Sequence, residues 1–362
     1  MAGIAVMNKP FQTAIAGNIQ ALNALLPAFK AVPHFEVAAL CGRNQETIRA
    51  AAAKAGVPKV YPTWEALADD PEIQVVALAL PPLLQSVAAV RLAAAGKHLF
   101  CEKPLAADLA GAQSMFNAVT AHQRVAAVNF GFRMIEAFRD FHVIAQSGIL
   151  GPPQYGMVEW LLATRRDASL SWNWKSDVRQ GGGTLNMMTS HVLDYLGWFF
   201  GDVLAARLQA TSLVAARPDG VSGQLKPVAA DDSNNLLLTL APQLPVSVTV
   251  STALSVSQGH RLRVWFEKGL LELANSPTDD FHDGFKLTFH PAKNTAAMLS
   301  PEVRRLAVHS QMAPYFPGRI AVTRRVVEQF ALALAGQENS APTLLDGLRV
   351  QKWMEMARQS PM

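Results

Sequence analysis

Three short polar segments each follow an apolar run of the sequence, and their residue types suit a phosphate-bearing ligand and a reacting oxygen. They are Gly17-Asn18-Ile19, Gly42-Arg43-Asn44 and Glu102-Lys103-Pro104. A glycine turn admits a phosphate group, an arginine binds one, and a lysine stabilises a developing negative charge. If the apolar runs are parallel strands of one sheet, the segments meet at its carboxyl edge, where such sheets bind ligands.

The first segment is only a partial dinucleotide-binding loop. In a G-x-G-x-x-G loop the second glycine lets the backbone approach the pyrophosphate, and the third lets helix and strand pack closely. Ile19 and Leu22 stand at those two positions here, so only Gly17 remains. The alternative interpretation is an ordinary helix start with Asn18 as its cap.

The second segment bears on which dinucleotide binds. NAD enzymes usually place an Asp or Glu after the second strand, whereas a small residue followed by Arg leaves room for a 2′-phosphate and supplies a charged partner for it. Gly42-Arg43-Asn44 fits the second pattern, so we expect NADP, with NAD as the other possibility. The alternative is that Arg43 is a solvated loop residue.

The surrounding pattern predicts the elements that position these segments. Strands are expected at residues 11–16, 35–41, 59–61, 73–80, 98–101 and 125–130, with helices between them. Asn44 and Thr63 are expected helix caps, and Gly56 an expected helix end. Continuous apolar strands with helical crossovers predict a doubly wound parallel sheet covered on both faces, and therefore an α/β fold.

Beyond Gly148 the pattern changes to alternation. Val246, Val248 and Val250 alternate with polar residues, which predicts half-buried antiparallel strands. Residues 261–266 and 270–273 predict a hairpin. The tail returns to helical periodicity, so we expect a second domain of antiparallel sheet and helices.

Composition excludes several classes of protein. Of the 362 residues, 50% are hydrophobic and 17% are charged, so the chain can bury large cores. The net charge of +4 comes without a long basic run, and we expect no nucleic-acid partner. Cys41 and Cys101 are too few for a disulfide scaffold or a multi-cysteine metal site, and we expect no metal. Without a signal-peptide pattern or an unbroken apolar run of about 20 residues, we expect a cytoplasmic protein with no membrane partner.

Longer segments resemble the Gfo/Idh/MocA family, which includes glucose-fructose oxidoreductase and inositol dehydrogenase. Residues 95–105, AGKHLFCEKPL, are similar to the family's AGKHVLCEKP signature. Pro81-Pro82 stands where the family has a proline pair, and residues 181–194 resemble its GGGALLDIGSHLID segment. Asp346-Gly347-Leu348, with Gln351, resembles its closing helix, so the resemblance covers nearly the whole chain in the right order.

The resemblance implies an architecture and a ligand. It implies an N-terminal Rossmann dinucleotide-binding domain over residues 1–130 and a substrate and oligomerisation domain over residues 131–343. The second domain would be α/β with a large, mostly antiparallel open sheet. Residues 344–362 would form a C-terminal helix that packs back on the N-terminal domain. A bound nicotinamide dinucleotide is also implied.

The resemblance further assigns roles to single residues. In the family, the lysine of the EKP motif and the histidine of the GGG helix hold the reacting oxygen, and these are Lys103 and His191 here. An ammonium and an imidazole suit oxidation of a carbinol or its reversal. The expected catalytic residues are Lys103, His191 and Asp194. The expected cofactor-binding residues are Gly17, Asn18, Ile19, Gly42, Arg43, Asn44, Pro81, Pro82, Glu102 and Lys103.

Several positions depart from the family pattern. Met187 stands where the family has its catalytic Asp, one helical turn before His191, and a thioether cannot orient or charge an imidazole as a carboxylate would. Asp194 could partly substitute, and the alternative is that it caps or pairs structurally. Thr189 replaces a usual glycine and Gln85 a common histidine. We expect both to narrow and alter the pocket, which suggests a substrate or reaction off the family's main line.

An aromatic and cationic stretch precedes the GGG segment. Aromatic planes beside Arg, Asn and Lys suit a polyhydroxylated or anionic ligand. The expected substrate-binding residues are Arg165, Trp172, Trp174, Lys175, Met187 and His191. The alternative is a cluster that packs a loop or an interface.

Together these observations predict an oxidoreductase that transfers hydride between a nicotinamide cofactor, with NADP favoured, and a sugar-like or other small carbonyl or carbinol substrate. We expect a homodimer or homotetramer formed through the C-terminal sheet. Two alternatives stay open. One is a non-catalytic NADP-binding regulator, suggested by Met187 and the reduced glycine loop. The other is a hydrolase or lyase that uses a tightly held NAD(P) for transient oxidation.

Overall fold

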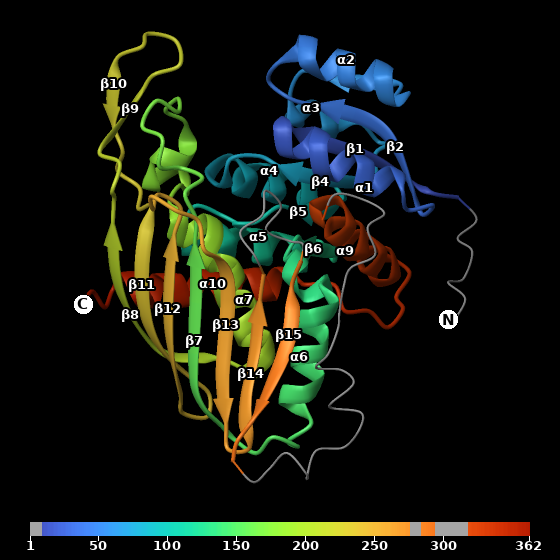
Figure 1. Ribbon diagram of the computed structural model, residues 1–362. Coiled ribbons are helices and arrows are strands. Elements are labelled where there is room, and N and C mark those ends of the chain that lie inside the picture. Colours follow the sequence, from blue (N-terminus) through green and yellow to red (C-terminus); the bar gives the residue numbers. More distant parts are fainter. Residues whose placement is uncertain (1–8, 276–283, 294–317) are drawn as a thin grey trace. The chain divides into compact units, whose positions relative to one another are not determined.

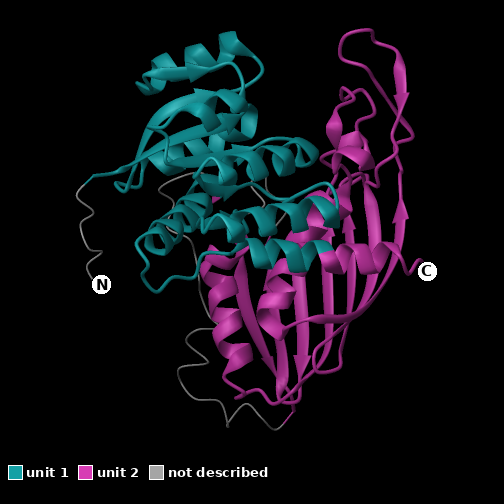
Figure 2. Cartoon of the chain, turned by 180° about the vertical axis from the view of Figure 1, so that it is seen from behind, with its two compact units in different colours: residues 1–131, 319–351 teal, residues 132–318, 352–362 magenta. Residues whose placement is uncertain are grey.

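A computed structural model of the chain describes residues 9–275, 284–293 and 318–362 (Figure 1). The start of the chain, which we considered for a signal peptide, lies largely outside these residues. The chain forms two compact units, drawn in different colours in Figure 2. Unit 1 comprises residues 1–131 and 319–351, and unit 2 comprises residues 132–318 and 352–362. Helix α10 (Leu344–Arg358) contributes residues to both units.

Unit 1 contains a six-stranded parallel sheet in the order β3-β2-β1-β4-β5-β6. The strands are β1 (Phe11–Gly17), β2 (Phe35–Cys41), β3 (Lys59–Tyr61), β4 (Val75–Ala79), β5 (His98–Cys101) and β6 (Ala126–Val128). The order reverses between β1 and β4, which is where a doubly wound sheet opens a crevice at its carboxyl edge. The predicted doubly wound parallel sheet is confirmed.

Helices connect the strands of unit 1, and α9 completes the unit from far along the chain. They are α1 (Leu26–Lys30), α2 (Gln45–Ala55), α3 (Trp64–Asp69), α4 (Pro82–Ala94), α5 (Leu109–Ala121) and α9 (Gly318–Leu334). Phe29, Phe35, Phe100 and Phe330 are buried together, with ring centroids 5.0–5.9 Å apart. This cluster joins α1, β2 and β5 to α9, so a helix near the C-terminus belongs to the core of unit 1.

The predicted caps can be compared with the observed ones. Asn44 Oδ1 accepts a hydrogen bond from Thr47 N at 3.1 Å, and Gly56 ends α2 with a φ of +67°, as predicted. Thr63 directly precedes α3, as predicted for a cap, but its side chain makes no capping hydrogen bond, so the predicted side-chain cap is wrong. Strand β6 is shorter than predicted, because after it the chain turns and Phe130 N donates to Val128 O at 2.8 Å.

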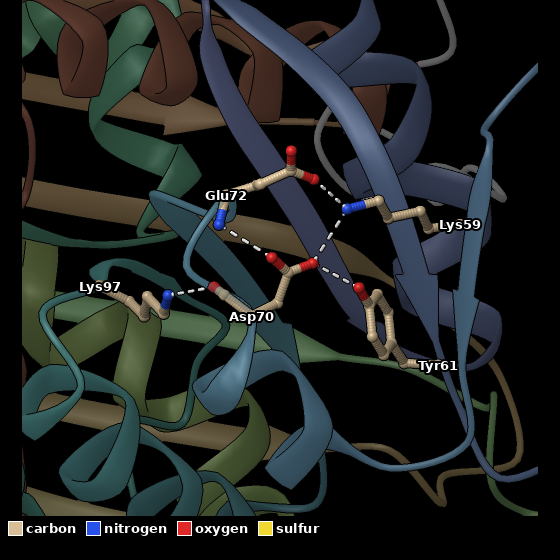
Figure 3. Close-up of polar contacts among 5 residues, drawn as sticks. All are labelled: Lys59, Tyr61, Asp70, Glu72 and Lys97. Atoms are coloured by element: carbon tan, nitrogen blue, oxygen red, sulfur yellow. Dashed lines mark hydrogen bonds and ion pairs between the residues drawn. The ribbon is translucent and has the colours of Figure 1, made fainter.

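Asp70, in the segment that leads into β4, binds two residues of β3 (Figure 3). Its carboxylate accepts hydrogen bonds from Lys59 Nζ (3.1 Å), from Glu72 N (2.8 Å) and from the Tyr61 hydroxyl. Lys59 also pairs with Glu72. The Tyr61 hydrogen bond is the main cause that lowers the pKa of Asp70 to about 2, so this carboxylate stays charged over most of the pH range.

Lys97, the first lysine of the 95–105 segment, has a structural place. It is 4% exposed, and its Nζ donates to Asp70 O at 2.5 Å (Figure 3). Burial lowers the pKa of Lys97. The two lysines of this segment therefore differ in role, and Lys103 is the one that follows a strand at the carboxyl edge.

Unit 2 contains a seven-stranded sheet in the order β15-β14-β13-β7-β12-β11-β8. The strands are β7 (Pro153–Leu161), β8 (Val203–Thr211), β11 (Ser233–Leu240), β12 (Leu244–Ser251), β13 (Gly259–Phe266), β14 (Gly269–Ala274) and β15 (Lys286–Pro291). Its ladders are antiparallel except β7–β12, which is parallel, so the predicted mostly antiparallel open sheet is confirmed. The predicted hairpin is β13–β14.

Two helices cover one face of this sheet, α6 (Glu136–Gln146) and α7 (Ser190–Phe200) (Figure 1). Phe138 and Phe141 of α6 pack against Tyr195 and Phe199 of α7. A small ladder of β9 (Ala216–Pro218) and β10 (Leu225–Pro227) stands apart from the main sheet. This aromatic layer fixes α7, which carries His191.

Candidate functional site

Two glycines shape the carboxyl edge of the unit 1 sheet. Gly17 ends β1 with a φ of +146°, and a Cβ there would lie 2.5 Å from Ala79 O at the end of β4. A Cβ on Gly42 would lie 2.5 Å from Gly17 O and 2.8 Å from Ile48 Cδ1. Both positions therefore require glycine so that the ends of β1, β2 and β4 approach one another. Because these two positions carry no side chain, the sheet edge presents backbone atoms there, which suits a dinucleotide.

The segment after Gly17 differs from a regular helix start. Asn18 is exposed and Ile19 is 78% exposed, while the chain enters a π-helical turn, η1 (Ala21–Leu25), before α1. π-turns insert an extra residue into a helix and occur frequently at functional sites. Asn18 accepts through its backbone oxygen, from Leu22 N at 2.9 Å, and η1 has no side-chain cap. The Asn18 side-chain cap of the alternative interpretation is therefore not formed.

The next cofactor candidates follow β2 and β4. Arg43 is exposed, whereas the Asn44 side chain is used as the cap of α2. Pro81 precedes α4, Pro82 opens it, and Pro81 O accepts from Gln85 N at 2.8 Å. The proline pair thus sets the direction in which α4 leaves the sheet edge.

The buried Glu102 carboxylate holds the EKP loop, residues 102–104, through hydrogen bonds. It is 6% exposed, and its Oε1 accepts hydrogen bonds from Asn129 Nδ2 (2.8 Å) and Gln20 Nε2 (3.0 Å). Its Oε2 accepts from Lys103 N at 3.3 Å. Asn129 also donates to Thr323 Oγ1 at 3.2 Å. The Glu102 carboxylate therefore links the loop after β1, the end of β6 and α9 to the backbone of Lys103.

Gln85, which we expect to narrow and alter the pocket, also supports the same loop. It is 1% exposed, and its Nε2 donates to Glu102 O (2.6 Å), Leu105 O (3.1 Å) and Pro104 O (3.3 Å). The amide is turned onto the backbone rather than into open space. A side-chain amide can bond to several carbonyls of one loop, and α4 places it beneath them.

In unit 2 the glycine run of residues 181–183 is packed against two other loops. A Cβ on Gly182 would lie 2.5 Å from Trp174 O and 2.6 Å from Lys175 O. Gly183 has a φ of +99°, and a Cβ there would lie 2.3 Å from Asp231 Oδ1. The glycines therefore allow the expected substrate-binding stretch and the start of the His191 helix to lie against each other.

The His191 helix begins with a second π-helical turn, η5 (Leu185–Thr189), which continues into α7. His191 is 2% exposed, and its ring lies 5.0 Å from that of Phe132 and 6.2 Å from that of Trp160. Met187 is half-buried. Because the π-helical turn over residues 185–189 includes Met187 and ends just before His191, the spacing of a straight α-helix does not describe how these two side chains share a face.

Asp194 is bound to a residue that the sequence did not single out. Arg133 Nη2 lies 2.6 Å from Asp194 Oδ1, and Arg133 Nε lies 3.0 Å from Asp194 Oδ2. Asp194 is 1% exposed. A two-point guanidinium–carboxylate pair of this kind is strong and directional.

Two residues of the expected substrate-binding stretch, Arg165 and Trp172, contact other segments of unit 2. Trp172 Nε1 donates to Pro227 O at 3.0 Å, and Lys226 lies over its ring, so this tryptophan packs on the β9–β10 ladder. Arg217, 1% exposed, donates to Arg165 O (2.5 Å) and Asp167 O (2.6 Å) and so holds the preceding loop. Burial, and then the charge of Arg217, lower the pKa of Arg165.

Thr189 is buried, and its Oγ1 donates to Asn234 Oδ1 at 3.0 Å. The effect of Thr189 on the pocket stays a prediction, and this contact shows only what its hydroxyl binds. Sequence reasoning also missed a set of supporting residues: Gln20, Asn129, Arg133, Arg217, Asp231 and Asn234. A polar residue inside an apolar run, as at Asn129 and Arg133, is the signal that could have found some of them.

The two cysteine thiols are not reactive near neutral pH. Burial raises the pKa of both Cys41 and Cys101 to about 12, so neither thiol is ionised near neutral pH. Within the described ranges, no group of three or more His, Cys, Asp or Glu side chains is arranged as a metal site. Over those same residues, no helix is long and apolar enough to cross a bilayer.

Two curated proteins among those that match this chain are each 29% identical to it over the aligned residues. An uncharacterized oxidoreductase of Synechocystis sp. is 29% identical over 304 residues, which are 83% of this chain and 80% of that protein. Levoglucosan dehydrogenase of Pseudarthrobacter phenanthrenivorans is 29% identical over 177 residues, which are 48% of this chain and 45% of that protein.

Comparison with solved structures shows the same fold. Levoglucosan dehydrogenase in complex with NADH and L-sorbose has a TM-score of 0.81 at 21% identity, over 97% of this chain and 96% of that chain. An oxidoreductase domain protein from Kribbella flavida has a TM-score of 0.80 at 22% identity, over the same shares.

Family models match both parts of the chain in order. The model of the Gfo/Idh/MocA oxidoreductase family with its NAD-binding Rossmann fold matches residues 11–130. The model of the Gfo/Idh/MocA C-terminal domain matches residues 138–272. The chain therefore belongs to the Gfo/Idh/MocA family of NAD(P)-dependent oxidoreductases.

Proposed function

We propose that this protein transfers hydride between NADP and a sugar-like or other small carbonyl or carbinol substrate, with NAD as the second possible cofactor. The observation that carries the proposal is the placement of Lys103. It directly follows Glu102 at the carboxyl end of β5, and its loop is held by the Glu102 carboxylate and by Gln85. A reacting oxygen needs a positively charged group in a fixed place, and these contacts provide the fixation.

The residues at the sheet edge fit a dinucleotide. Gly17 and Gly42 leave backbone at the ends of β1 and β2, and Ile19 and Arg43 are exposed directly after them. A bound nicotinamide would supply or accept the hydride. Arg43 would bind a 2′-phosphate, which supports NADP, whereas Asn44 would contribute through its backbone because its side chain caps α2.

The named relatives support a sugar-like substrate. They include levoglucosan dehydrogenase and myo-inositol 2-dehydrogenase of Thermotoga maritima, and the levoglucosan enzyme has been solved with NADH and L-sorbose. We infer that Lys103 and His191 hold the reacting oxygen and exchange its proton. Arg165, Trp174 and Lys175 are the proposed substrate contacts from the stretch before the glycine run.

We further propose a homodimer or homotetramer built through the seven-stranded sheet. Tyr155, Leu204 and Leu237, on β7, β8 and β11, are 42%, 49% and 53% exposed. Large apolar side chains on one sheet are typical of an interface. Leu237→Glu should lower the mass measured by light scattering, whereas Val221→Glu, at a 99% exposed position, should not.

The hydride-transfer proposal is tested with NADP(H) or NAD(H) and a panel of levoglucosan, L-sorbose, myo-inositol and glucose. Lys103→Met should abolish turnover while NADP(H) binding, measured by calorimetry, persists. Lys54→Met, at an exposed lysine of α2, is the matched control and should keep full turnover. Unchanged turnover in Lys103→Met would refute the role of this lysine.

The same assay separates the alternatives. A regulator would bind NADP(H) yet exchange no hydride with any sugar of the panel. A hydrolase or lyase with transient oxidation would form product without net consumption of NADPH.

A further inference from the structure

We propose that Asp231 is a positioning residue: through Leu185 N, and through Asn234 to Thr189, it fixes the first turns of the helix that carries His191. The proposal rests on the role proposed for His191 in catalysis. Asp231 lies in the loop that leads into β11, more than thirty positions after His191 in the chain, and its carboxylate accepts from Leu185 N and Asn234 Nδ2.

The contacts form a chain of hydrogen bonds along the helix start. Asp231 Oδ2 accepts from Leu185 N at 2.9 Å, at the first residue of η5. The same oxygen accepts from Asn234 Nδ2 at 3.0 Å, and Asn234 Oδ1 accepts from Thr189 Oγ1 at 3.0 Å. The backbone oxygen of Asp231 accepts from Thr184 N at 2.8 Å. One residue thus satisfies two amide groups that a helix start leaves without partners inside the helix.

The chain around Asp231 is built for this contact. Gly183 has a φ of +99°, and any Cβ there would come within 2.3 Å of Asp231 Oδ1. Thr189 stands at the position where the family pattern has glycine, and its hydroxyl is the donor that joins η5 to Asn234. A glycine at 189 could not make this bond. The departure from the family pattern therefore has a structural consequence at the turn directly before His191.

The π-turn explains why the helix start needs an external holder. In η5, Ser190 N bonds to Leu185 O rather than following the usual α-helical pattern, and such turns are less regular than α-helix. Asn186 is held from the other side, because its Oδ1 accepts from Arg358 Nη2 at 2.6 Å. A shift of about 1 Å at a catalytic group costs up to about 100-fold in rate, so the position of this turn matters to His191.

The charges around Asp231 make the contact sensitive to pH. Burial of its carboxylate raises the pKa of Asp231 to about 6, against the effect of the Asn234 and Leu185 hydrogen bonds and of the Arg358 charge. Asp232, the next residue along the chain, accepts from Leu213 N and Val214 N, and Glu355 lies 3.8 Å from the Arg358 guanidinium. A protonated Asp231 is a weaker acceptor, so the helix start should be held less firmly below about pH 6.

Two readouts test the proposal in the full-length protein. The first is the nitrogen NMR signal of the His191 imidazole, assigned by its loss in His191→Gln, which needs neither cofactor nor substrate. The second is kcat and KM with the best sugar of the panel. Asp231→Asn should move the His191 signal and remove an inflection near pH 6 from its titration. It should lower kcat by about 10- to 100-fold with little change in KM.

A matched pair of variants covers the case in which Asp231→Asn does not fold. Thr189→Val keeps the branched shape but loses the hydroxyl, and it should shift the His191 signal in the same direction. Thr189→Ser keeps the hydroxyl and should restore the wild-type signal. Asp219→Asn is the control, because that carboxylate also accepts from two backbone amides, Val221 N and Ser222 N, but in the β9–β10 loop.

The outcomes are distinct. If the His191 signal and its titration are unchanged in Asp231→Asn and in Thr189→Val, the positioning role is refuted, whether or not a sugar is turned over. If the signal shifts but kcat does not, Asp231 orders the helix without serving catalysis, and the proposal is also overturned. If no sugar of the panel reacts, the hydride-transfer proposal fails, while the NMR measurement still decides whether Asp231 positions His191.

Discussion

Arg133 and Asp194 form a buried two-point ion pair, with 2.6 Å between Nη2 and Oδ1 and 3.0 Å between Nε and Oδ2. The Asp194 side chain is 1% exposed and that of Arg133 is 12% exposed. Arg133 precedes α6 and Asp194 lies in α7, so the pair connects the two helices that cover the unit 2 sheet. Both carboxylate oxygens of the acid nearest to His191 along α7 are therefore bound to a guanidinium.

This pair predicts a large loss of stability in Asp194→Asn. Removing one member of a buried ion pair leaves the other charge without compensation, which costs about 3–5 kcal/mol. The free energy of unfolding, measured in urea, should fall by that amount. The double variant Arg133→Met/Asp194→Leu should recover much of it, because a buried pair replaced by apolar residues is often neutral. Normal stability with a shifted pH–rate profile in Asp194→Asn would instead place the acid in the proton relay.

Asp70 predicts an acid-dependent contribution to stability (Figure 3). Its pKa is lowered to about 2 from 3.8, so its stabilising effect is fully present above about pH 4 and is lost as the pH falls towards 2. Asp70→Asn should lower the free energy of unfolding at pH 7 by about 1–3 kcal/mol, because charged hydrogen bonds are lost. It should also flatten the stability curve between about pH 2 and 4. An equal acid dependence in variant and wild type would contradict this assignment.

The raised pKa of Asp231 predicts a pH dependence of stability that is opposite in sign to that of Asp70. Its pKa is raised from 3.8 to about 6, so the folded state binds the proton more readily than the unfolded state. Stability should therefore fall as the pH rises from about 4 to 6. Asp231→Asn removes the titrating group, so the free energy of unfolding of this variant should change less between about pH 4 and 6 than that of the wild type. Thermal unfolding at pH 4.5 and 7 measures the difference. If the variant loses as much stability between pH 4.5 and pH 7 as the wild type does, this prediction is wrong.

Arg43 predicts which cofactor binds more tightly. If its exposed guanidinium binds a 2′-phosphate, Arg43→Ala should weaken NADP binding by about 10- to 100-fold, the worth of a charged hydrogen bond, and leave NAD binding unchanged. Isothermal titration calorimetry gives both affinities. Arg49→Ala, at an exposed position of α2, is the control and should change neither. Equal affinities for NADP and NAD in the wild type would remove the reason for the assignment.

Local patterns were sufficient for the architecture. Apolar runs and helical periodicity identified the six parallel strands of unit 1, and Asn44 and Gly56 marked the ends of α2 correctly. Alternation along residues 246–250 identified antiparallel strands of unit 2. These features depend on residues that are close in sequence, because side-chain period and helix capping are set within a few positions. The parallel β7–β12 ladder was missed, since strand pairing between distant segments has no local pattern.

The partners of the candidate site residues came from the packing of elements that are distant in the sequence. Sequence motifs indicated that Glu102 and Asp194 match one family and that Gln85 and Thr189 depart from it, but not what these side chains bind. Gln85 and Glu102 turned out to hold the Lys103 loop, Thr189 bonds to Asn234, and Asp194 pairs with Arg133. The physical reason is that a buried polar group must find a partner, and which partner lies within about 3 Å depends on how distant elements pack.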